Sequence, residues 1–341
     1  MTVIRPVAPA DLDGLFALAS LAGVGLTTLP KDRELLQKRI KKSVDSFATN
    51  ADKPGGESYL FVMEDSGTHQ VVGACGITSK VGGFQPFYAY KIETALFESK
   101  IIHVSKQVPI LRLDEEHDGP CEIGSLFLHP DFRHNGNGRM LQLVRFLFMA
   151  EHPERFESTV VSEIRGTLDE SGRSPFWDAL GKHFFAIDFA EADRLSVVNK
   201  KFIAELMPRH PIYIPLLPQS AQAVIGKPHR ESERAVKNLE AEGFKFANMV
   251  DIFDAGPVLS CPRDEIRSVK QSRRVRIRGT GDSPVSSTQP KFLLGTTADH
   301  FRACHAAIQL DPDGIVIPQT AADALQVQPG DQIRIVELDA P

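Results

Sequence analysis

FLHPDFRHNGNGRMLQLV (residues 127–144) begins as an apolar strand, breaks at Pro130 and resumes with helical periodicity from Met140 onward. Between strand and helix lies the spacing R-x-x-G-x-G (residues 133–138). Where a strand, a glycine loop and a helix N-terminus follow one another, free backbone N–H groups and the helix dipole favour a bound anion. Phosphate is therefore the first ligand class to test.

The composition is that of an ordinary globular protein. At 341 residues the chain exceeds one typical domain, and 42% apolar with 24% charged residues is a common balance. The net charge of −5 argues against binding nucleic acid through a broad basic field. We therefore expect no nucleic-acid partner, and the charge is compatible with a cationic small substrate.

Membrane and metal signals are weak in this sequence. No apolar run reaches the length of about 18 residues that a membrane helix needs, and the N-terminus lacks the layout of a secretory signal. We expect a cytoplasmic protein without a membrane partner. The four cysteines are far apart and form no C-x-x-C, so neither a disulfide framework nor a metal site is expected.

Strands and helices alternate along the first half of the chain. Strands are expected at 3–5, 121–129 and 159–166, a hairpin at 57–77, and helices near 8–19, 32–47, 140–150 and 171–185. The last helix should begin at Ser174, with proline at its first position. The acidic run LDEEHDG (113–119) is interpreted as a solvated loop. This order predicts an α/β fold with a mixed, twisted sheet and helices on both faces.

The element order resembles that of the GNAT superfamily of N-acetyltransferases, and the R-x-x-G-x-G segment resembles its acyl-coenzyme A pyrophosphate loop. The resemblance implies that the donor's phosphates are bound by Arg133, Asn135, Gly136, Gly138 and Arg139. It also implies that backbone groups at Leu126, Phe127 and Leu128 lie against the acyl-pantetheine arm and polarise the thioester carbonyl. The alternative for the glycine loop is a turn that only caps a helix.

Nearly the whole chain is similar to the arginine N-succinyltransferase family. The shared segments are VIRPV (3–7), GLTTLP (25–30), SPFWDALGKHFF (174–185), AELMPRHPIY (204–213) and DIFDAGP (251–257). The resemblance implies transfer of a succinyl group from succinyl-CoA to the α-amino group of L-arginine. The products are N2-succinylarginine and CoA, in the first step of arginine degradation. In the family, the residue matching Leu126 is assigned to succinyl-CoA.

His229 is the leading catalytic candidate. It lies in GKPHRESE ahead of a helix, and its near-neutral pKa suits proton transfer. Local sequence alone favours a surface histidine near a helix start, but the family resemblance reverses this, because the family assigns the matching residue as proton donor. The acid role is otherwise open, because 174–185 contains no tyrosine.

Several further residues are candidates for contacts with the substrate. Those for the guanidinium group are Glu122, Glu163, Asp251 and Asp254, and those for the succinyl carboxylate are Arg209 and His210. The sequence does not separate them from solvated or salt-bridged groups.

Three domains are expected, at 1–190, 191–265 and 266–341. ERAVKNLEAEGFKF repeats the pattern of DALGKHFF, so the middle segment can be read as part of a second acetyltransferase-like half that completes the active site. The last segment predicts a small β-barrel, in which RRVRIR (273–278) is a solvated edge strand.

A second functional interpretation also fits the family. It includes paired-subunit versions, so the chain could be a non-catalytic or ornithine-preferring subunit that binds acyl-CoA. The expected partners are accordingly succinyl-CoA, L-arginine or ornithine, and either further copies of the chain or a paralogous subunit.

Overall fold

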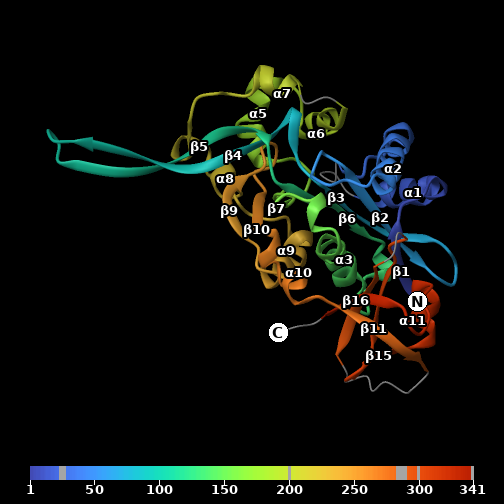
Figure 1. Cartoon of the computed structure of the whole chain (residues 1–341). Coiled ribbons are helices and arrows are strands. Elements are labelled where there is room, and N and C mark those ends of the chain that lie inside the picture. Colours follow the sequence, from blue (N-terminus) through green and yellow to red (C-terminus); the bar gives the residue numbers. More distant parts are fainter. Residues whose placement is uncertain (23–27, 199–200, 282–289, 298–299, 339–341) are drawn as a thin grey trace.

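The computed structural model describes residues 1–22, 28–198, 201–281, 290–297 and 300–338 (Figure 1). Its strands are β1 (Thr2–Pro6), β2 (Ser58–Asp65), β3 (Val71–Thr78), β4 (Gly82–Ser99), β5 (Val104–Asp118), β6 (Cys121–Leu128), β7 (Thr159–Glu163), β8 (Ile212–Tyr213), β9 (Lys245–Val250), β10 (Pro257–Pro262), β11 (Arg273–Thr280), β12 (Lys291–Thr296), β13 (Ala303–Ala307), β14 (Gln309–Asp311), β15 (Gly314–Ile317) and β16 (Gln332–Glu337). Its helices are α1 (Leu12–Leu21), α2 (Arg33–Ala48), α3 (Asn137–Glu151), α4 (Pro175–Ala179), α5 (Gly181–Phe185), α6 (Phe189–Val198), α7 (Lys201–Leu206), α8 (Gln219–Gln222), α9 (Glu233–Ala241), α10 (Arg267–Gln271) and α11 (Gln319–Leu325).

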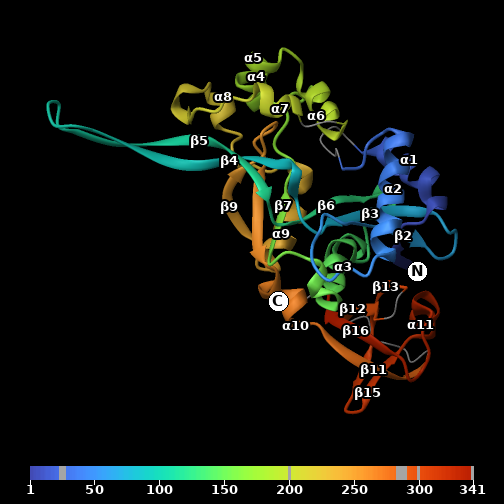
Figure 2. The same ribbon diagram turned by 45° about the horizontal axis from the view of Figure 1, so that its top comes forward.

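Within these residues the strands form one mixed sheet in the order β14-β15-β11-β16-β12-β13-β1-β2-β3-β6-β7-β10-β9-β4-β5-β8. The strand β2 shows why both faces are covered. Leu60 and Val62 pack with α1 and α2, whereas Phe61 and Met63 pack with α3 on the opposite face. This alternation follows from the two-residue period of a strand. The predicted mixed α/β sheet with helices on both faces is confirmed (Figure 2).

The helix α9 and the strands β9 and β10 complete this sheet. β10 pairs antiparallel with β7 on one side and with β9 on the other. Leu239 of α9 and Leu259 of β10 join the core of α3. This segment therefore shares one sheet and one core with the first half, and its apolar pattern is explained by burial there. Its interpretation as part of a second acetyltransferase-like half stays a prediction.

β4 and β5 form a long two-stranded arm that projects from the body (Figures 1 and 2). The acidic run 113–119, expected as a loop, is mostly strand: Asp114 pairs with Ala89 and its carboxylate contacts Lys91 at 2.8 Å. Charged residues are tolerated in this strand because solvent reaches much of the ribbon. At the tip, Ile101 and Ile102 are 91% and 69% exposed.

The C-terminal strands form a β-rich unit with its own core, which includes Ile277, Leu294 and Ile335 and the apolar face of α11. The expected closed barrel is not found among the described strands, because β13 pairs with β1 and the sheet continues into the body. β11 pairs with β16 over residues 273–276 and with β15 only from Ile277 onward, so most of RRVRIR is paired on one side only. Its arginines are largely exposed, as expected for a solvated edge strand.

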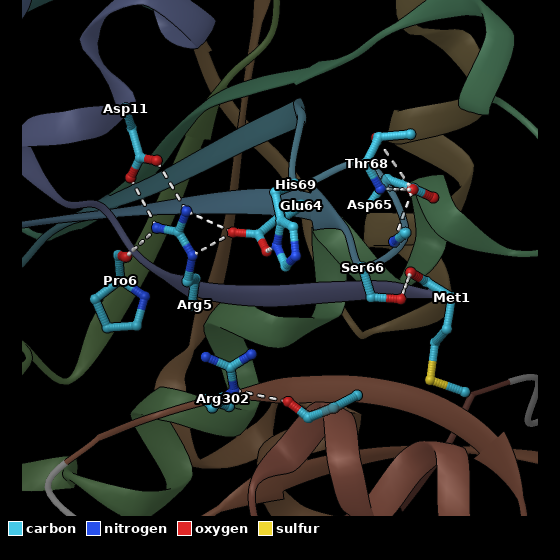
Figure 3. A network of polar contacts seen from close by, with 12 residues as sticks. Met1, Arg5, Pro6, Asp11, Glu64, Asp65, Ser66, Thr68, His69 and Arg302 are labelled. Atoms are coloured by element: carbon cyan, nitrogen blue, oxygen red, sulfur yellow. Dashed lines mark hydrogen bonds and ion pairs between the residues drawn. The ribbon is translucent and has the colours of Figure 1, made fainter.

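Arg5 ties the N-terminal strand to its neighbours (Figure 3). Its guanidinium donates to both carboxylate oxygens of Asp11 at 2.7 and 2.8 Å and to Glu64 at 2.6 and 2.8 Å. Glu64 also contacts His69 Nδ1 at 2.8 Å. Charge-assisted bonds shielded from water are strong. They therefore fix β1 against η1 (Pro9–Asp11) and β2.

Several sequence expectations concern local features. Ser174 caps α4 as predicted, accepting the Trp177 N–H at 3.0 Å. Residues 25–27, the first half of GLTTLP, lie outside the described residues. None of the described helices is long and apolar enough to cross a membrane. In the same part of the chain, no group of three or more His, Cys, Asp or Glu side chains could hold a metal ion.

Candidate functional site

The strands β6 and β7 are paired at one end and free of each other further along. They pair in parallel at Cys121–Val160 and Glu122–Val161. Beyond these pairs, the register of β6 with β3 shifts, and Ser125 has a φ of 56°. A register shift with a left-handed residue is a β-bulge, which re-aims the groups that follow it. The backbone of Leu126 comes directly after this bulge.

Arg39 of α2 holds the bulge in place. Its Nη2 donates to Ser125 Oγ at 2.5 Å, its Nη1 bonds the Thr28 carbonyl, and the Ser125 N–H donates to Thr28 Oγ1 at 3.1 Å. Burial lowers the pKa of Arg39 to about 10, against the opposing effect of the Glu122 carboxylate. Arg39 is not among the residues predicted from the sequence. The available signal was a basic residue beside Leu36 and Ile40 on the buried side of an amphipathic helix.

The R-x-x-G-x-G segment adopts a left-handed turn that opens α3. Asn135 and Gly136 have φ values of 55° and 86°, and the helix begins at Asn137. The first N–H groups of a helix have no acceptor within the helix. Asn135 and Gly138 are exposed, so these donors face a surface that a phosphate can reach. The geometry suits the predicted loop, and its binding role stays a prediction.

Arg133 lies across the end of β6. Its Nε donates to the Leu128 carbonyl at 3.0 Å, and its guanidinium lies 5.7 Å from the centre of the Phe127 ring. These contacts orient an exposed cation beside the loop, whereas Arg139, in the first turn of α3, is partly buried.

His229 is held at the end of β7. Its N–H donates to the Arg165 carbonyl at 2.7 Å, and its Nδ1 accepts the Glu231 N–H at 3.2 Å, so the neutral ring carries its proton on Nε2. Burial and then the charge of Arg165 lower the pKa of His229, while Glu231 opposes them. The ring is therefore mainly neutral at pH 7.

The register brings His229 opposite the bulge. Leu126 and Arg165 each lie four positions beyond the last paired residues, Glu122 and Val161. Parallel strands advance equally per residue, but the bulge at Ser125 adds one residue to β6, so Leu126 lies about one residue short of the level of Arg165. His229, bonded to Arg165, and the backbone of Leu126 thus flank the same opening between the strands.

The candidates for the guanidinium group differ in their surroundings. Asp254 is buried, and its carboxylate oxygens accept the Gly166 and Gly256 N–H groups at 2.7 and 2.8 Å. Burial and the neighbouring Asp251 raise the pKa of Asp254 well above its usual range. Asp254 therefore locks the end of β7 and is committed to the backbone. Asp251 in turn accepts hydrogen bonds from the backbone N–H groups of Phe253 and Asp254.

Glu122 and Glu163 are partly buried on the two strands that flank the opening. They are therefore better placed than the two aspartates for a contact with the guanidinium group. Arg209 and His210 are both exposed, and Arg209 donates to the Ala204 carbonyl at 3.4 Å. The structure does not bring these two residues to the bulge through any described contact.

A cavity of about 550 Å³ lies elsewhere, between α1, the β2–β3 hairpin and residues 129–132. It contains none of the predicted site residues. Two of its polar groups, Asp11 and His69, are already engaged by Arg5 and Glu64. We therefore do not place the chemistry there.

Comparisons with known proteins cover the entire chain. The family model "Arginine N-succinyltransferase beta subunit" matches residues 2–268, and that of its C-terminal domain matches 273–337. Two curated relatives, the arginine N-succinyltransferases of Salmonella schwarzengrund and Salmonella agona, are each 42% identical over 100% of this chain and 98% of their own. The solved structure of arginine/ornithine succinyltransferase subunit AI from Pseudomonas aeruginosa superposes with a TM-score of 0.91 at 35% identity, covering 100% of this chain and 99% of that one. These matches over the whole length show that this chain belongs to the arginine N-succinyltransferase family.

Proposed function

We propose that this protein transfers the succinyl group of succinyl-CoA to the α-amino group of L-arginine, giving N2-succinylarginine and CoA. The observation that carries the proposal is the opening between β6 and β7. A bulge follows the paired end on β6, His229 is bonded to Arg165 just beyond the end of β7, and a loop suited to phosphate follows β6.

The donor is bound from the loop inward. The backbone around Gly136 and Gly138, with Arg133, holds the pyrophosphate, and the pantetheine arm runs back along β6. The thioester carbonyl then meets the Leu126 N–H, and one well-placed donor of this kind stabilises the oxyanion by about 3 kcal/mol. The amine attacks the thioester carbon directly, and the C–S bond breaks without a covalent enzyme intermediate.

His229 transfers one of the protons that the reaction moves. The α-ammonium group of arginine loses two protons in the reaction: one goes to water and the other reaches the departing sulfur. The neutral ring first takes the amine's second proton and becomes an imidazolium, which then gives a proton to sulfur as the C–S bond breaks, so His229 ends neutral. A protonated ring could not take that proton, so activity should fall below the pKa of His229.

The alternative is a non-catalytic or ornithine-preferring subunit of a paired complex. An intact loop and His229 favour a competent chain. The deciding experiment supplies the purified single chain with succinyl-CoA and either arginine or ornithine, and identifies products by mass spectrometry, with His229→Ala as control. If the single chain binds CoA but forms no product, it is a partner subunit; if ornithine reacts faster, the acceptor assignment changes.

We also propose that the protein is an oligomer, of itself or with a paralogous subunit. The β4–β5 arm supports this, because its apolar tip at Ile101 and Ile102 is bare and a two-stranded ribbon is marginally stable alone. Light scattering of the wild type and of the double variant Ile101→Ser/Ile102→Ser tests this proposal. An unchanged mass in the variant would exclude the arm as the contact between subunits.

A cytoplasmic location is consistent with four buried cysteines that form no disulfide.

A further inference from the structure

The helix α3 is apolar on nearly every side, yet it carries an arginine at its centre. Arg145 interrupts the run MLQLVRFLFM and is only 2% exposed. Arginine is almost never this deeply buried unless it is paired with an anion. Arg145 therefore needs an explanation that packing alone does not give.

The contacts of Arg145 leave its charge uncompensated. Its Nε donates to the Gln142 carbonyl at 3.0 Å and its Nη1 to the Gly124 carbonyl at 3.4 Å. Its Nη2 has no hydrogen bond, and no carboxylate pairs with Arg145, among the residues that the structure describes. The ionisable groups that act on it are the thiols of Cys75 and Cys121, whose own pKa values are raised by burial, so they stay uncharged.

We propose that Arg145 receives the distal carboxylate of the succinyl group. This inference rests on the proposed function for the identity of the donor. The bond to Gly124 places the guanidinium beneath β6, two residues before Leu126 and next to the bulge. An incoming carboxylate would supply the anion that Arg145 lacks, in the bidentate geometry that guanidinium groups favour.

The direction and length of the donor fit this position. The phosphate loop follows β6, so an acyl chain that continues past Leu126 points toward Gly124 and the paired end of the two strands. Two residues of extended strand span about 7 Å, and the left-handed Ser125 between them shortens this distance. The succinyl group places its carboxylate carbon three C–C bonds of about 1.5 Å each from the thioester carbon, which leaves the remaining distance for a hydrogen bond.

Other cations near the bulge are less suited to this role. Arg39 lies on the α2 face, where both terminal nitrogens are already bonded, to Thr28 and Ser125, which leaves only Nε without a partner. Arg209 is exposed. Arg145 thus has a terminal nitrogen without a hydrogen bond in a buried environment, where an uncharged acyl group would leave its charge unpaired. A site built to bond a charged group rejects the analogue that lacks it.

The test compares succinyl-CoA with butyryl-CoA, which has the same chain length and a methyl group in place of the carboxylate. For the wild type we expect kcat/KM to favour succinyl-CoA by at least about a hundredfold. In Arg145→Met the succinyl value should fall about a hundredfold while the butyryl value stays level or rises. The control is Arg302→Met, a partly buried arginine whose Nε donates to the Ala324 carbonyl at 2.7 Å. It should keep the wild-type preference.

Calorimetric binding of the same two thioesters without acceptor separates this inference from the proposed function. If the wild type makes no succinylarginine but binds succinyl-CoA preferentially, and Arg145→Met loses that preference, the proposed activity fails and the inference stands. If a folded Arg145→Met keeps the preference, the inference is overturned. Should the methionine variant not fold, Arg145→Gln replaces it, and an unchanged preference there overturns the inference equally.

Discussion

Replacing Gly138 by alanine should make the protein more stable and its donor binding weaker. Gly138 has an ordinary helical φ, and a Cβ there would lie no closer than 3.8 Å to another residue, Leu128 Cδ2. Alanine in place of glycine in a helix stabilises by about 0.5–1 kcal/mol. The same Cβ projects from the exposed first turn, where the pyrophosphate must approach the backbone.

The size of the binding loss follows from the bonds removed. A hydrogen bond to a charged group contributes about 1.5–3 kcal/mol, and each 1.4 kcal/mol is a factor of about ten in affinity. We therefore expect the Kd for CoA to rise about 10- to 100-fold in Gly138→Ala. Gly136→Ala should differ, because its φ of 86° costs a side chain about 1–2 kcal/mol and its Cβ would lie 3.3 Å from Leu338.

Thermal unfolding and calorimetry with CoA measure the two effects separately. Gly279→Ala is the matched control, because its Cβ would meet nothing within 4 Å and it lies on β11, in the C-terminal unit. A Gly138→Ala protein that melts normally and binds CoA as tightly as the wild type would refute the assignment of the loop.

Three further predictions concern His229, the Arg5 network and the backbone beside β7. His229→Ala should lower kcat by about 10²–10⁴ with little change in CoA affinity. Arg165→Gln should move the acidic limb of the pH–rate profile to higher pH, because it removes a charge that lowers the pKa of His229. A limb that stays at the wild-type pH would contradict this. Arg5→Met should lower the free energy of unfolding at pH 7 by about 3 kcal/mol. Burial alone would raise the pKa of Glu64, but the bonds from His69 and Arg5 lower it. The stabilisation is therefore complete above the pKa of Glu64 in the unfolded chain and disappears as the pH falls through the lowered pKa of the folded protein. If the difference in unfolding free energy between wild type and Arg5→Met does not depend on pH, the pairing is excluded. Gly256→Ala should not fold stably, since its Cβ would lie 2.0 Å from the Ile164 carbonyl oxygen, and a normal melting temperature would show that this turn can relax.

Local features of this protein were determined by the sequence alone. The order of strands and helices around 127–144, the glycine turn before α3 and the cap at Ser174 all depend on residues close together in the chain. Periodicity, glycine conformation and capping act over a few residues, so their patterns can be read directly. The family resemblance added His229 and Leu126, which no local pattern separates from ordinary surface and core residues.

Long-range features were decided only by the tertiary structure. The acidic run 113–119 is a strand because β4 offers it a partner, and the C-terminal sheet stays open because β1 pairs with β13. No pattern within either segment encodes its partner.

The same reason explains the residues that the sequence analysis missed. Arg39 and Arg145 reach Ser125 and Gly124 only because the helices α2 and α3 pack on opposite faces of β6. His229 meets Arg165 only because a distant loop returns to the end of β7. Sequence specifies which groups are available, whereas burial and the distances between remote segments decide which of them act together, and those depend on the packing of the whole chain.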